Sequence, residues 1–410
     1  MPLLELESFE KILPKKLIER LAIEHNVDKC NQIKLPGMLV FACLLNIILS
    51  GRKVSLRNLE EQYEIKTGET IDHSTFGKRF AKIPVDFFRD IFEYLFAVLS
   101  DQATPSEKHA LKIRFVDATI VALSARLLHI GLLANHRSKK GPLRYIKAVF
   151  SLNEYGLPRI MRICANADEN SDCVALGDPI LASVKPKDLL IFDAGMTDRQ
   201  RMLQINNANA YFITRHSTQR LNTLDVVYEV DQDQITDYEP QKGAPTYQLL
   251  RVEDCRFGTQ ADGDKFENFP VVVIYGRRWN IRDKVWSPLV IMTNLPLSDN
   301  NTKAGEYSFK DVAELYRRRW EIETFFRFIK QNLGYSHVLS RSQNGIEVMI
   351  YMTLIVSLLM IWYKKATQIK GSWEAVEMWL TADVTEWTAE LMDRAIFNQV
   401  AARKNRPRRI

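Results

Sequence analysis

The chain has 410 residues, of which 46% are hydrophobic, which is enough for a sizeable core and for more than one structural unit. Its 56 basic and 50 acidic residues give a formal net charge of +6, a mild excess that fits nucleic acid without pointing to it alone. The five cysteines are scattered and form no C-x-x-C pair, which argues against a disulfide framework or structural zinc and favours a reducing cytoplasm.

The first predicted region, residues 1–108, is helical. Ser55 is a predicted helix N-cap, and a turn at Gly68 leads to a second short helix that carries Lys78 and Arg79. Two short helices joined by such a turn are typical of a DNA-binding helix-turn-helix. An ordinary helical subdomain with a solvated basic face explains the same pattern equally well.

Residues 109–216 alternate between strand-like and helix-like segments, which predicts a mixed α/β architecture. The apolar run LKIRFVDATIVAL contains Asp117, and the buried-type strand DLLIFD ends at Asp193. Either aspartate alone could be a turn or capping residue.

Three further regions complete the predicted organisation. Residues 217–286 contain strand-like runs separated by Gly/Asp/Pro-rich turns and are expected to form a β-rich insertion. Residues 287–370 are the second part of the core and include an uncharged run over 348–363. The run is shorter than the ~20 residues of a membrane span and is predicted as a buried helix, with a membrane span as the minor alternative. Residues 371–410 form a C-terminal helical region with a basic tail, a candidate for dimerisation.

The stretch YRRRWEIETFFRFIK, residues 316–330, reads as one helix with many charges. At about 100° per residue, four polar side chains share a stripe roughly 60° wide beside the apolar face. They are Tyr316, Arg319, Glu323 and Lys330. An i,i+4 salt-bridge ladder is the simple interpretation of this stripe.

The two strand aspartates, Asp117 and Asp193, favour a catalytic role for Glu323 over a simple salt bridge. Ionised carboxylates in apolar strands are costly unless they are paired, protonated or bound to a metal. If Asp117, Asp193 and Glu323 converge at one sheet edge, they form an all-oxygen cluster of the kind that suits Mg²⁺ or Mn²⁺. Two such ions can assist an in-line phosphoryl transfer.

These residues give the chain a resemblance to a known family. Tyr316, Arg319, Glu323 and Lys330 match the Y-x2-R-x3-E-x6-K signature of bacterial insertion-sequence transposases of the hairpin-forming, Tn-five-like group. The signature follows an apolar-strand D-x-T at Asp117 and a strand-end D-x-G, in the order that this family shows. The resemblance spans roughly residues 30–365.

The resemblance implies a ribonuclease-H-like core in which Asp117, Asp193 and Glu323 are the catalytic ligands of two Mg²⁺ (or Mn²⁺) ions. It also implies that Tyr316, Arg319 and Lys330 contact DNA phosphates. Such enzymes cut at the terminal inverted repeats and join the freed 3′-OH to target DNA, within a homodimeric synapse. A cytoplasmic location, on the bacterial nucleoid when DNA is bound, and no membrane association follow from the same family.

Other basic residues fall where a DNA path could pass. The loop and strand after the first aspartate are expected to contact phosphates, through Lys139, Lys140, Arg144 and Lys147. A solubilising loop is the alternative. Arg215, which ends YFITR, is a candidate phosphate ligand near Asp193 or else a structural ion-pair partner.

Two tryptophans are candidates for contact with bases. The family often places a tryptophan for a flipped base in the strand before the signature, where this chain has Leu289, so base capture is assigned to the nearby Trp286. Trp320, directly after Arg319, could stack near DNA or belong to the core.

The sequence therefore predicts a metal-dependent DNA transposase. A sequence-preferring endonuclease on the same core, which never joins strands, is the nearest alternative. A non-catalytic DNA-binding regulator derived from a transposase is the second, although such a protein has no need of three costly carboxylates.

Overall fold

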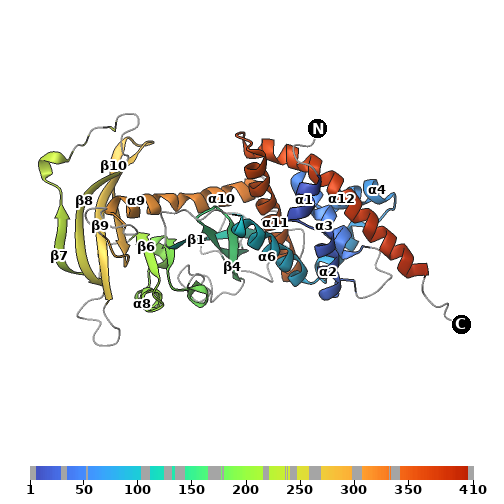
Figure 1. The fold of residues 1–410 in the computed structure, drawn as a ribbon, viewed down its shortest axis with the longest axis horizontal. Helices are drawn as coiled ribbons and strands as arrows, with labels where there is room; N and C mark the ends of the chain where they lie inside the picture. Colours follow the sequence, from blue (N-terminus) through green and yellow to red (C-terminus); the bar gives the residue numbers. More distant parts are fainter. Residues whose placement is uncertain are drawn as a thin grey trace. The chain divides into compact units, whose positions relative to one another are not determined.

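The computed structural model describes residues 6–28, 35–51, 54–102, 111–123, 132–133, 144–164, 177, 180–215, 221–235, 237, 239–240, 247–257, 269–297, 307–331, 333 and 342–404 (Figure 1). The chain divides into two compact units. The helical unit comprises Met1–Thr104, Val121–Tyr145 and Phe325–Ile410, and the sheet unit comprises Pro105–Ile120 and Ile146–Thr324. The first and last predicted regions thus belong to one unit.

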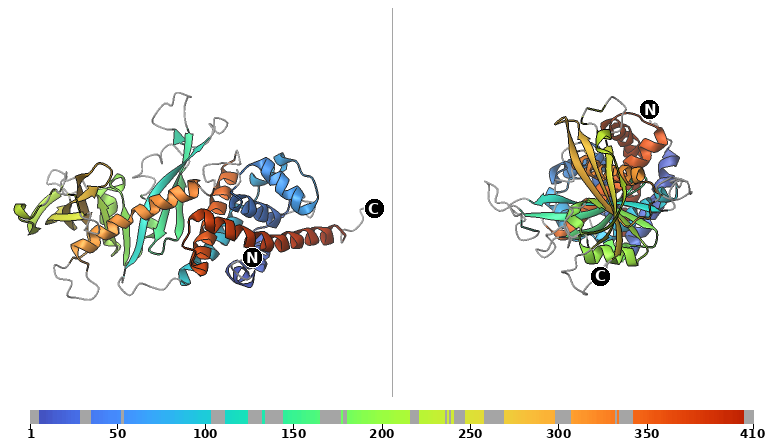
Figure 2. Two further views of the ribbon diagram at one scale, coloured as in Figure 1. Left: turned by 90° about the horizontal axis from the view of Figure 1, so that it is seen from above. Right: turned by 90° about the vertical axis from the view of Figure 1, so that its left-hand side faces the viewer.

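The helical unit is built from segments at both ends of the chain, which lie side by side in Figures 1 and 2. Its described helices are α1 (Leu6–Ile12), α2 (Lys15–Glu24), α3 (Gly37–Leu49), α4 (Leu56–Thr67), α5 (His73–Phe80), α6 (Val85–Asp101), α11 (Gln343–Thr367) and α12 (Trp373–Lys404). Helix α12 packs mainly on α3, and α11 packs mainly on α6.

The predicted local signals around α4 are confirmed. The Ser55 hydroxyl accepts a hydrogen bond from the Asn58 N–H and so satisfies one free donor of the first turn. Gly68 ends the helix in the left-handed conformation, at φ 68°, which glycine adopts without steric cost. The turn between α4 and α5 is therefore encoded locally.

Helix α11 contains the uncharged run and is the core of the helical unit. Its residues from Val348 to Met360 are buried without a break. Among the described residues it is the one helix long and apolar enough to cross a bilayer, yet 89% of its most apolar window is buried inside the molecule. The predicted core helix is confirmed, because the neighbouring helices already cover this surface.

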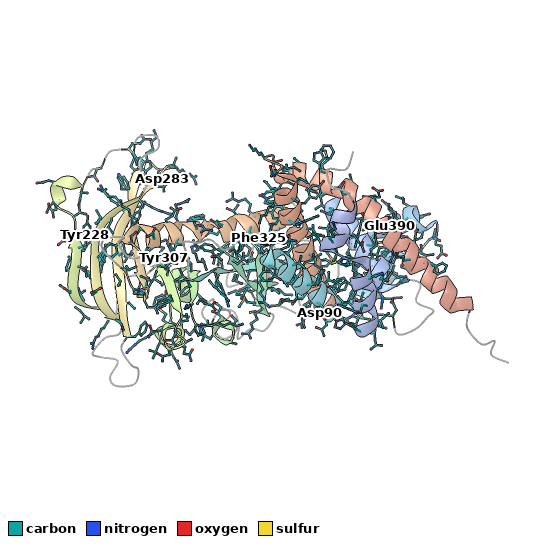
Figure 3. The ribbon with its side chains drawn as sticks, viewed as in Figure 1. Asp90, Tyr228, Asp283, Tyr307, Phe325 and Glu390 are labelled. Atoms are coloured by element: carbon teal, nitrogen blue, oxygen red, sulfur yellow. The ribbon has the colours of Figure 1, made fainter. Side chains whose placement is uncertain are left out.

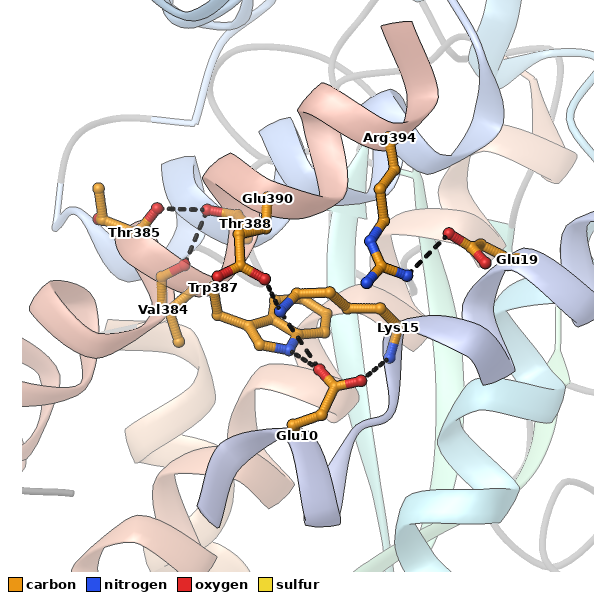
Figure 4. Close-up of polar contacts among 9 residues, drawn as sticks. All are labelled: Glu10, Lys15, Glu19, Val384, Thr385, Trp387, Thr388, Glu390 and Arg394. Atoms are coloured by element: carbon orange, nitrogen blue, oxygen red, sulfur yellow. Dashed lines mark hydrogen bonds and ion pairs between the residues drawn. The ribbon is translucent and has the colours of Figure 1, made fainter. Parts of the chain in front are cut away.

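A buried ammonium ties α2 to α12 (Figure 4). Lys15, which is 3% exposed, is paired with Glu390 at 2.6 Å and with Glu10 at 3.3 Å. Its charge also lies over the Trp387 ring, whose Nε1–H donates to Glu10. Two carboxylates and an aromatic face compensate the loss of hydration of this lysine.

The sheet unit is organised around one mixed sheet with the strand order β3-β1-β5-β6-β10-β9-β8-β7, and β4 pairs with β3 on the outside. Its longer strands before residue 216 are β1 (Lys112–Leu123), β3 (Arg144–Asn153), β4 (Pro158–Cys164), β5 (Asp188–Phe192) and β6 (Tyr211–Arg215). The short β2 (Leu132–Leu133) pairs with the start of β3. Strands β1, β5 and β6 run parallel, and α8 (Arg199–Asn207) connects the last two.

The expected β-rich insertion continues the same sheet. Its strands are β7 (Leu221–Glu229), β8 (Tyr247–Phe257), β9 (Phe269–Asn280) and β10 (Val285–Thr293). The end of β10 pairs with β6, while its whole length pairs with β9. Figure 2 shows how strongly these strands twist. Residue 286, the predicted end of the insertion, therefore falls inside β10 and marks no boundary.

Strand β7 is the free edge of this sheet. Every described side chain from Thr223 to Glu229 is exposed, including Tyr228, which Figure 3 labels. Asp225 and Glu229 place charges along this edge, and charges oppose unwanted pairing of an edge strand.

Candidate active site

The register of three parallel strands brings polar residues to one edge of the sheet. Phe115 of β1 is opposite Ile191 of β5, so Asp117 and Asp193 each lie two residues beyond that pair. The β5–β6 register aligns Phe192 with Thr214, and Arg215 is the next residue of β6. Because the strands are parallel, Asp193 and Arg215 lie together at the carboxyl ends of β5 and β6, and Asp117 lies next to them inside β1, just beyond the residues that pair with β5.

Two helices deliver the remaining polar side chains. Helix α9 (Phe309–Arg318) packs against β6, and α10 (Trp320–Gln331) follows it. The stretch predicted as one helix is broken at Arg319, which is not part of either helix. The Arg319 N–H donates to the Tyr316 carbonyl and the Ile322 N–H to the Arg319 carbonyl, both three residues back. These tighter turns break the regular helical ladder.

Arg319 stands between two of the three carboxylates. Its Nη2 donates to Glu323 Oε1 at 2.7 Å, and its Nη1 lies 3.7 Å from Asp117 Oδ2. The Arg319 side chain is 8% exposed, whereas those of Asp117 and Glu323 are 27% and 31% exposed. The carboxylates therefore reach solvent while the guanidinium lies beneath them.

Burial raises the pKa of the Asp117 carboxyl to about 6. The Ala118 N–H, which donates to Asp117 Oδ1 at 2.7 Å, and Arg319 both oppose this rise. Glu323 and Asp193 add to it, because nearby negative charges disfavour ionisation. The three carboxylates thus influence one another electrostatically.

Tyr316 links α9 to the second aspartate. Its hydroxyl donates to Asp193 Oδ1 at 3.4 Å, and the side chain is 5% exposed. Burial raises the pKa of Tyr316 to about 12, so the hydroxyl keeps its proton and remains a donor. Asp193 itself is exposed.

A cavity of about 540 Å³ lies in the sheet unit beside Tyr316. Strands β8 to β10 and helices α9 and α10 contribute its lining: Tyr247, Leu249, Arg278, Trp279, Leu289, Lys310, Ala313, Glu314, Tyr316, Arg317 and Trp320. The Tyr247 hydroxyl occupies the space over Gly276, where a Cβ atom would lie 2.3 Å from it. The cavity lining thus combines aromatic rings with basic side chains and one carboxylate, Glu314, which is paired with Arg317.

The sequence analysis missed most of this cavity. The sequence feature that could have indicated the cavity is the run YGRRWN in β9, in which a tyrosine and a tryptophan flank a glycine and two arginines. Trp286 does not line the cavity. It packs on Trp279 at 5.6 Å between ring centroids, and the Arg277 guanidinium lies over its ring at 4.8 Å. Trp320 does line it and is 45% exposed.

The other residues predicted to contact DNA differ in how exposed their side chains are. Lys78 is exposed, and Lys330 is half-buried in the last turn of α10. Lys139 and Lys140 lie outside the described residues, as does the side chain of Arg144. Lys147 is 5% exposed in a part of β3 where the neighbouring residues are buried as well, and its contact with DNA stays a prediction.

Arg79 makes structural contacts that its prediction as a DNA contact did not include, and that prediction stays untested. Its guanidinium donates to the carbonyls of Leu35 and Val27 and pairs with Asp28 at 2.6 Å. The Arg79 side chain is 11% exposed. These partners precede it by more than 40 residues, so the local helix-turn-helix pattern gave no sign of them.

The donor set fits a hard divalent cation. Carboxylate oxygens are the ligands that Mg²⁺ and Mn²⁺ prefer, and a cation would relieve the mutual repulsion that helps raise the pKa of Asp117. Within the described parts of the chain, no three acidic, histidine or cysteine side chains lie close enough to hold a metal. Instead, Arg319 lies between Asp117 and Glu323, and Tyr316 donates to Asp193.

Comparison with known proteins identifies related sequences. A family model described as "Transposase DDE domain" matches residues 153–359, just over half of the 410-residue chain. The matched segment contains Asp193 and Glu323 and begins after Asp117.

Curated relatives cover most of the chain. A protein of Synechocystis sp. assigned as a transposase for the insertion sequence element IS4SA is 21% identical over 318 residues, 77% of this chain and 78% of the relative. The assigned transposase y4zB of Sinorhizobium fredii is 26% identical over 281 residues, 68% of each chain. The transposase for insertion sequence element IS231B of Bacillus thuringiensis subsp. berliner is 22% identical, covering 73% and 67%.

Comparison with solved structures matches the chain to a transposase complex. It is the synaptic complex of piggyBac transposase with hairpin DNA, at 10% identity and a TM-score of 0.45, covering 98% of this chain and 85% of that chain.

Proposed function

The chain belongs to the family of transposases with a DDE domain, and we propose that it moves its insertion sequence by a cut-and-paste reaction at the terminal inverted repeats. It is a metal-dependent DNA transposase of the insertion-sequence type. Its catalytic residues, its metal ion and its DNA contacts are proposed below from the geometry of the site.

We propose that Asp117, Asp193 and Glu323 are the catalytic carboxylates. The observation that carries this assignment is the strand register, in which Asp117 and Asp193 each lie two residues beyond the last printed pair of the parallel strands β1 and β5. Glu323 joins them through Arg319, which contacts both Glu323 and Asp117. Two Mg²⁺ ions bound by these carboxylates would activate the attacking oxygen and stabilise the leaving oxygen.

The strand order supports a ribonuclease-H-like core. Strands β4 and β3 pair in an antiparallel hairpin, β3 neighbours β1, and β5 and β6 extend the sheet in parallel from β1. Strands β7 to β10 then interrupt this core before the glutamate helix. We assign the chain to the hairpin-forming group because its Y-x2-R-x3-E-x6-K signature ends on this helix pair.

We propose that Tyr316, Arg319, Lys330 and Arg215 hold DNA phosphates beside the carboxylates. Arg215 is exposed at the end of β6, next in register to Asp193, so its charge is available to a phosphate. Lys78 is a further candidate in the helical unit, and Lys139, Lys140 and Arg144 remain candidates after β1. Like the buried Tyr316 and Arg319, Lys147 and Arg79 would have to turn outward to reach a phosphate, because Lys147 is buried and Arg79 is paired with Asp28.

For an extruded base, the cavity beside Tyr316 is a better acceptor than the Trp286 surface. Its aromatic walls, Trp279, Trp320 and Tyr247, offer stacking faces, and Arg278 and Lys310 offer positive charge. Trp286 already packs on Trp279 and under Arg277. We propose that two copies of the chain act together on paired DNA ends, as the family requires for joined products.

Strand joining is the experiment that separates this function from its alternatives. Purified protein with Mg²⁺ is incubated with the DNA that flanks its own gene, and then with 3′-OH donor ends and a target plasmid. We expect metal-dependent cleavage followed by joined products. Cleavage without joining would identify an endonuclease, and binding without cleavage a regulator.

A further inference from the structure

Arg319 satisfies the carboxylates in the way that a bound cation would. One side of its guanidinium is bonded to Glu323 Oε1 at 2.7 Å, and the other lies 3.7 Å from Asp117 Oδ2. A divalent ion would take ligands from the same two carboxylates, and the positive guanidinium already placed between them would repel it. The guanidinium and the ion therefore compete for Glu323 and Asp117.

The position of Arg319 is enforced by its surroundings. The Arg319 Cζ lies 5.8 Å from the ring centroids of both Tyr316 and Trp320. The Arg278 Cζ also lies 5.8 Å from the Trp320 ring centroid. The interruption between α9 and α10 falls at this residue. The Arg319 Nε is buried without a hydrogen-bond partner among the described residues, so the group is not fully satisfied where it stands.

We propose that Arg319 is an internal counter-cation that keeps divalent metal from the carboxylates until DNA supplies an alternative anion. The proposal rests on the function assigned to Asp117 and Glu323 above. A phosphate of the DNA substrate is an anion that can accept both hydrogen bonds of the guanidinium fork. When Arg319 turns to the phosphate, Glu323 and Asp117 become available to metal.

This arrangement couples metal binding to DNA binding. Each ligand favours the state in which Arg319 has left Glu323, so each strengthens the binding of the other by the same factor. The carboxylates therefore hold no metal until the DNA substrate is bound. The nearby stacking partners, Trp320 and Tyr316, also line the cavity, so occupation of the cavity would act on the same guanidinium.

Mn²⁺ alone, without DNA, is the direct probe. Its affinity is measured by electron paramagnetic resonance for the wild type, for Arg319→Gln and for Arg327→Gln, with circular dichroism to verify folding. We expect Arg319→Gln to bind Mn²⁺ roughly tenfold more tightly, the value of one hydrogen bond to a charged group. Arg327→Gln removes an equal charge from an exposed position of α10 outside the cavity and should leave the affinity unchanged.

The possible outcomes separate the two proposals. If all three folded proteins bind Mn²⁺ equally, or Arg319→Gln binds it more weakly, Arg319 supports the metal site and the competition is refuted. If none binds Mn²⁺, the carboxylate assignment fails as well.

A second measurement serves if Arg319→Gln does not fold. Since Arg319 lies over the Trp320 ring, displacement of the guanidinium should change the Trp320 emission when Mg²⁺ binds to the wild type. The signal is the difference between wild type and Trp320→Phe, with binding followed by calorimetry. Mg²⁺ binding without any Trp320-dependent change would overturn the proposal.

Discussion

Buried charge decides the roles of several individual residues. Lys15 is stabilised by two carboxylates, and Asp188, which is fully buried, is paired with Arg114 at 2.8 Å. Glu377 on α12 is the contrasting case. Burial, with the neighbouring Glu374, raises the pKa of the Glu377 carboxyl to about 7. Ionisation of Glu377 is therefore a cost that the fold bears at neutral and alkaline pH.

Glu377→Gln should stabilise the protein at high pH. The unfolded carboxyl has a pKa of 4.5, so between pH 4.5 and about 7 the folded protein retains a proton that the unfolded chain releases. Stability therefore falls as pH rises through this window. Glutamine imitates the protonated form, and we expect a gain of at most about 3 kcal/mol at pH 8 that vanishes near pH 5.

Thermal melts of wild type and variant at pH 5 and pH 8 test this expectation. Glu386→Gln, at an exposed position of the same helix, is the matched control and should change neither melt. An equal effect of Glu377→Gln at both pH values would show that the carboxyl is ionised throughout.

At the scale of elements, α9 is the helix that fixes Tyr316 against Asp193. Its start is defined by a capping box, in which Ser308 Oγ accepts from the Asp311 N–H and the Asp311 carboxylate accepts from the Ser308 N–H. Both groups are exposed, so the cap acts on the helix and not on the core.

Ser308→Ala should weaken the start of α9 by about 1 kcal/mol. The melting temperature of the sheet unit should fall by roughly 2–4 °C, and Ser308→Asp, which can cap equally well, should restore it. Calorimetry of the three proteins measures this. If Ser308→Ala melts at the wild-type temperature, the cap contributes nothing to the unit that holds the carboxylates.

The elements differ in how far the sequence could predict them. Strands carrying Asp117 and Asp193, the cap at Ser55 and the buried α11 have local patterns, so they were predictable. The break at Arg319 was not, because it depends on packing against rings and carboxylates from other elements. The burial of Lys147 and the partners of Arg79 depend equally on residues distant in sequence.

The extent of the sheet was also beyond local patterns. Strands β7 to β10 have the composition of a separate β module, and only the pairing of β10 with β6 reveals that they prolong the core sheet. The cavity beside Tyr316 follows from this, since β8, β9 and β10 supply one wall and α9 and α10 the other. A pattern within each strand cannot show which face a helix will cover.

At the scale of the whole molecule, the two chain ends cooperate in one unit. Lys15→Met should destabilise the helical unit by about 1–2 kcal/mol, less than a fully buried pair, because Glu10 and Glu390 are 38% and 52% exposed and can be rehydrated. Lys16→Met, one residue on and exposed, is the control. Urea titrations of both variants measure the difference, and equal midpoints would exclude a role for the pairing.

The central claim is that three carboxylates from two strands and a helix form one metal-dependent catalytic site. The most direct measurement is Mg²⁺-dependent cleavage and joining of the DNA flanking the gene by Asp117→Ala, Asp193→Ala and Glu323→Ala, with DNA binding measured in parallel. The account predicts that each variant still binds the DNA ends but neither cleaves nor joins them. Strand transfer retained by any one of the three would contradict it.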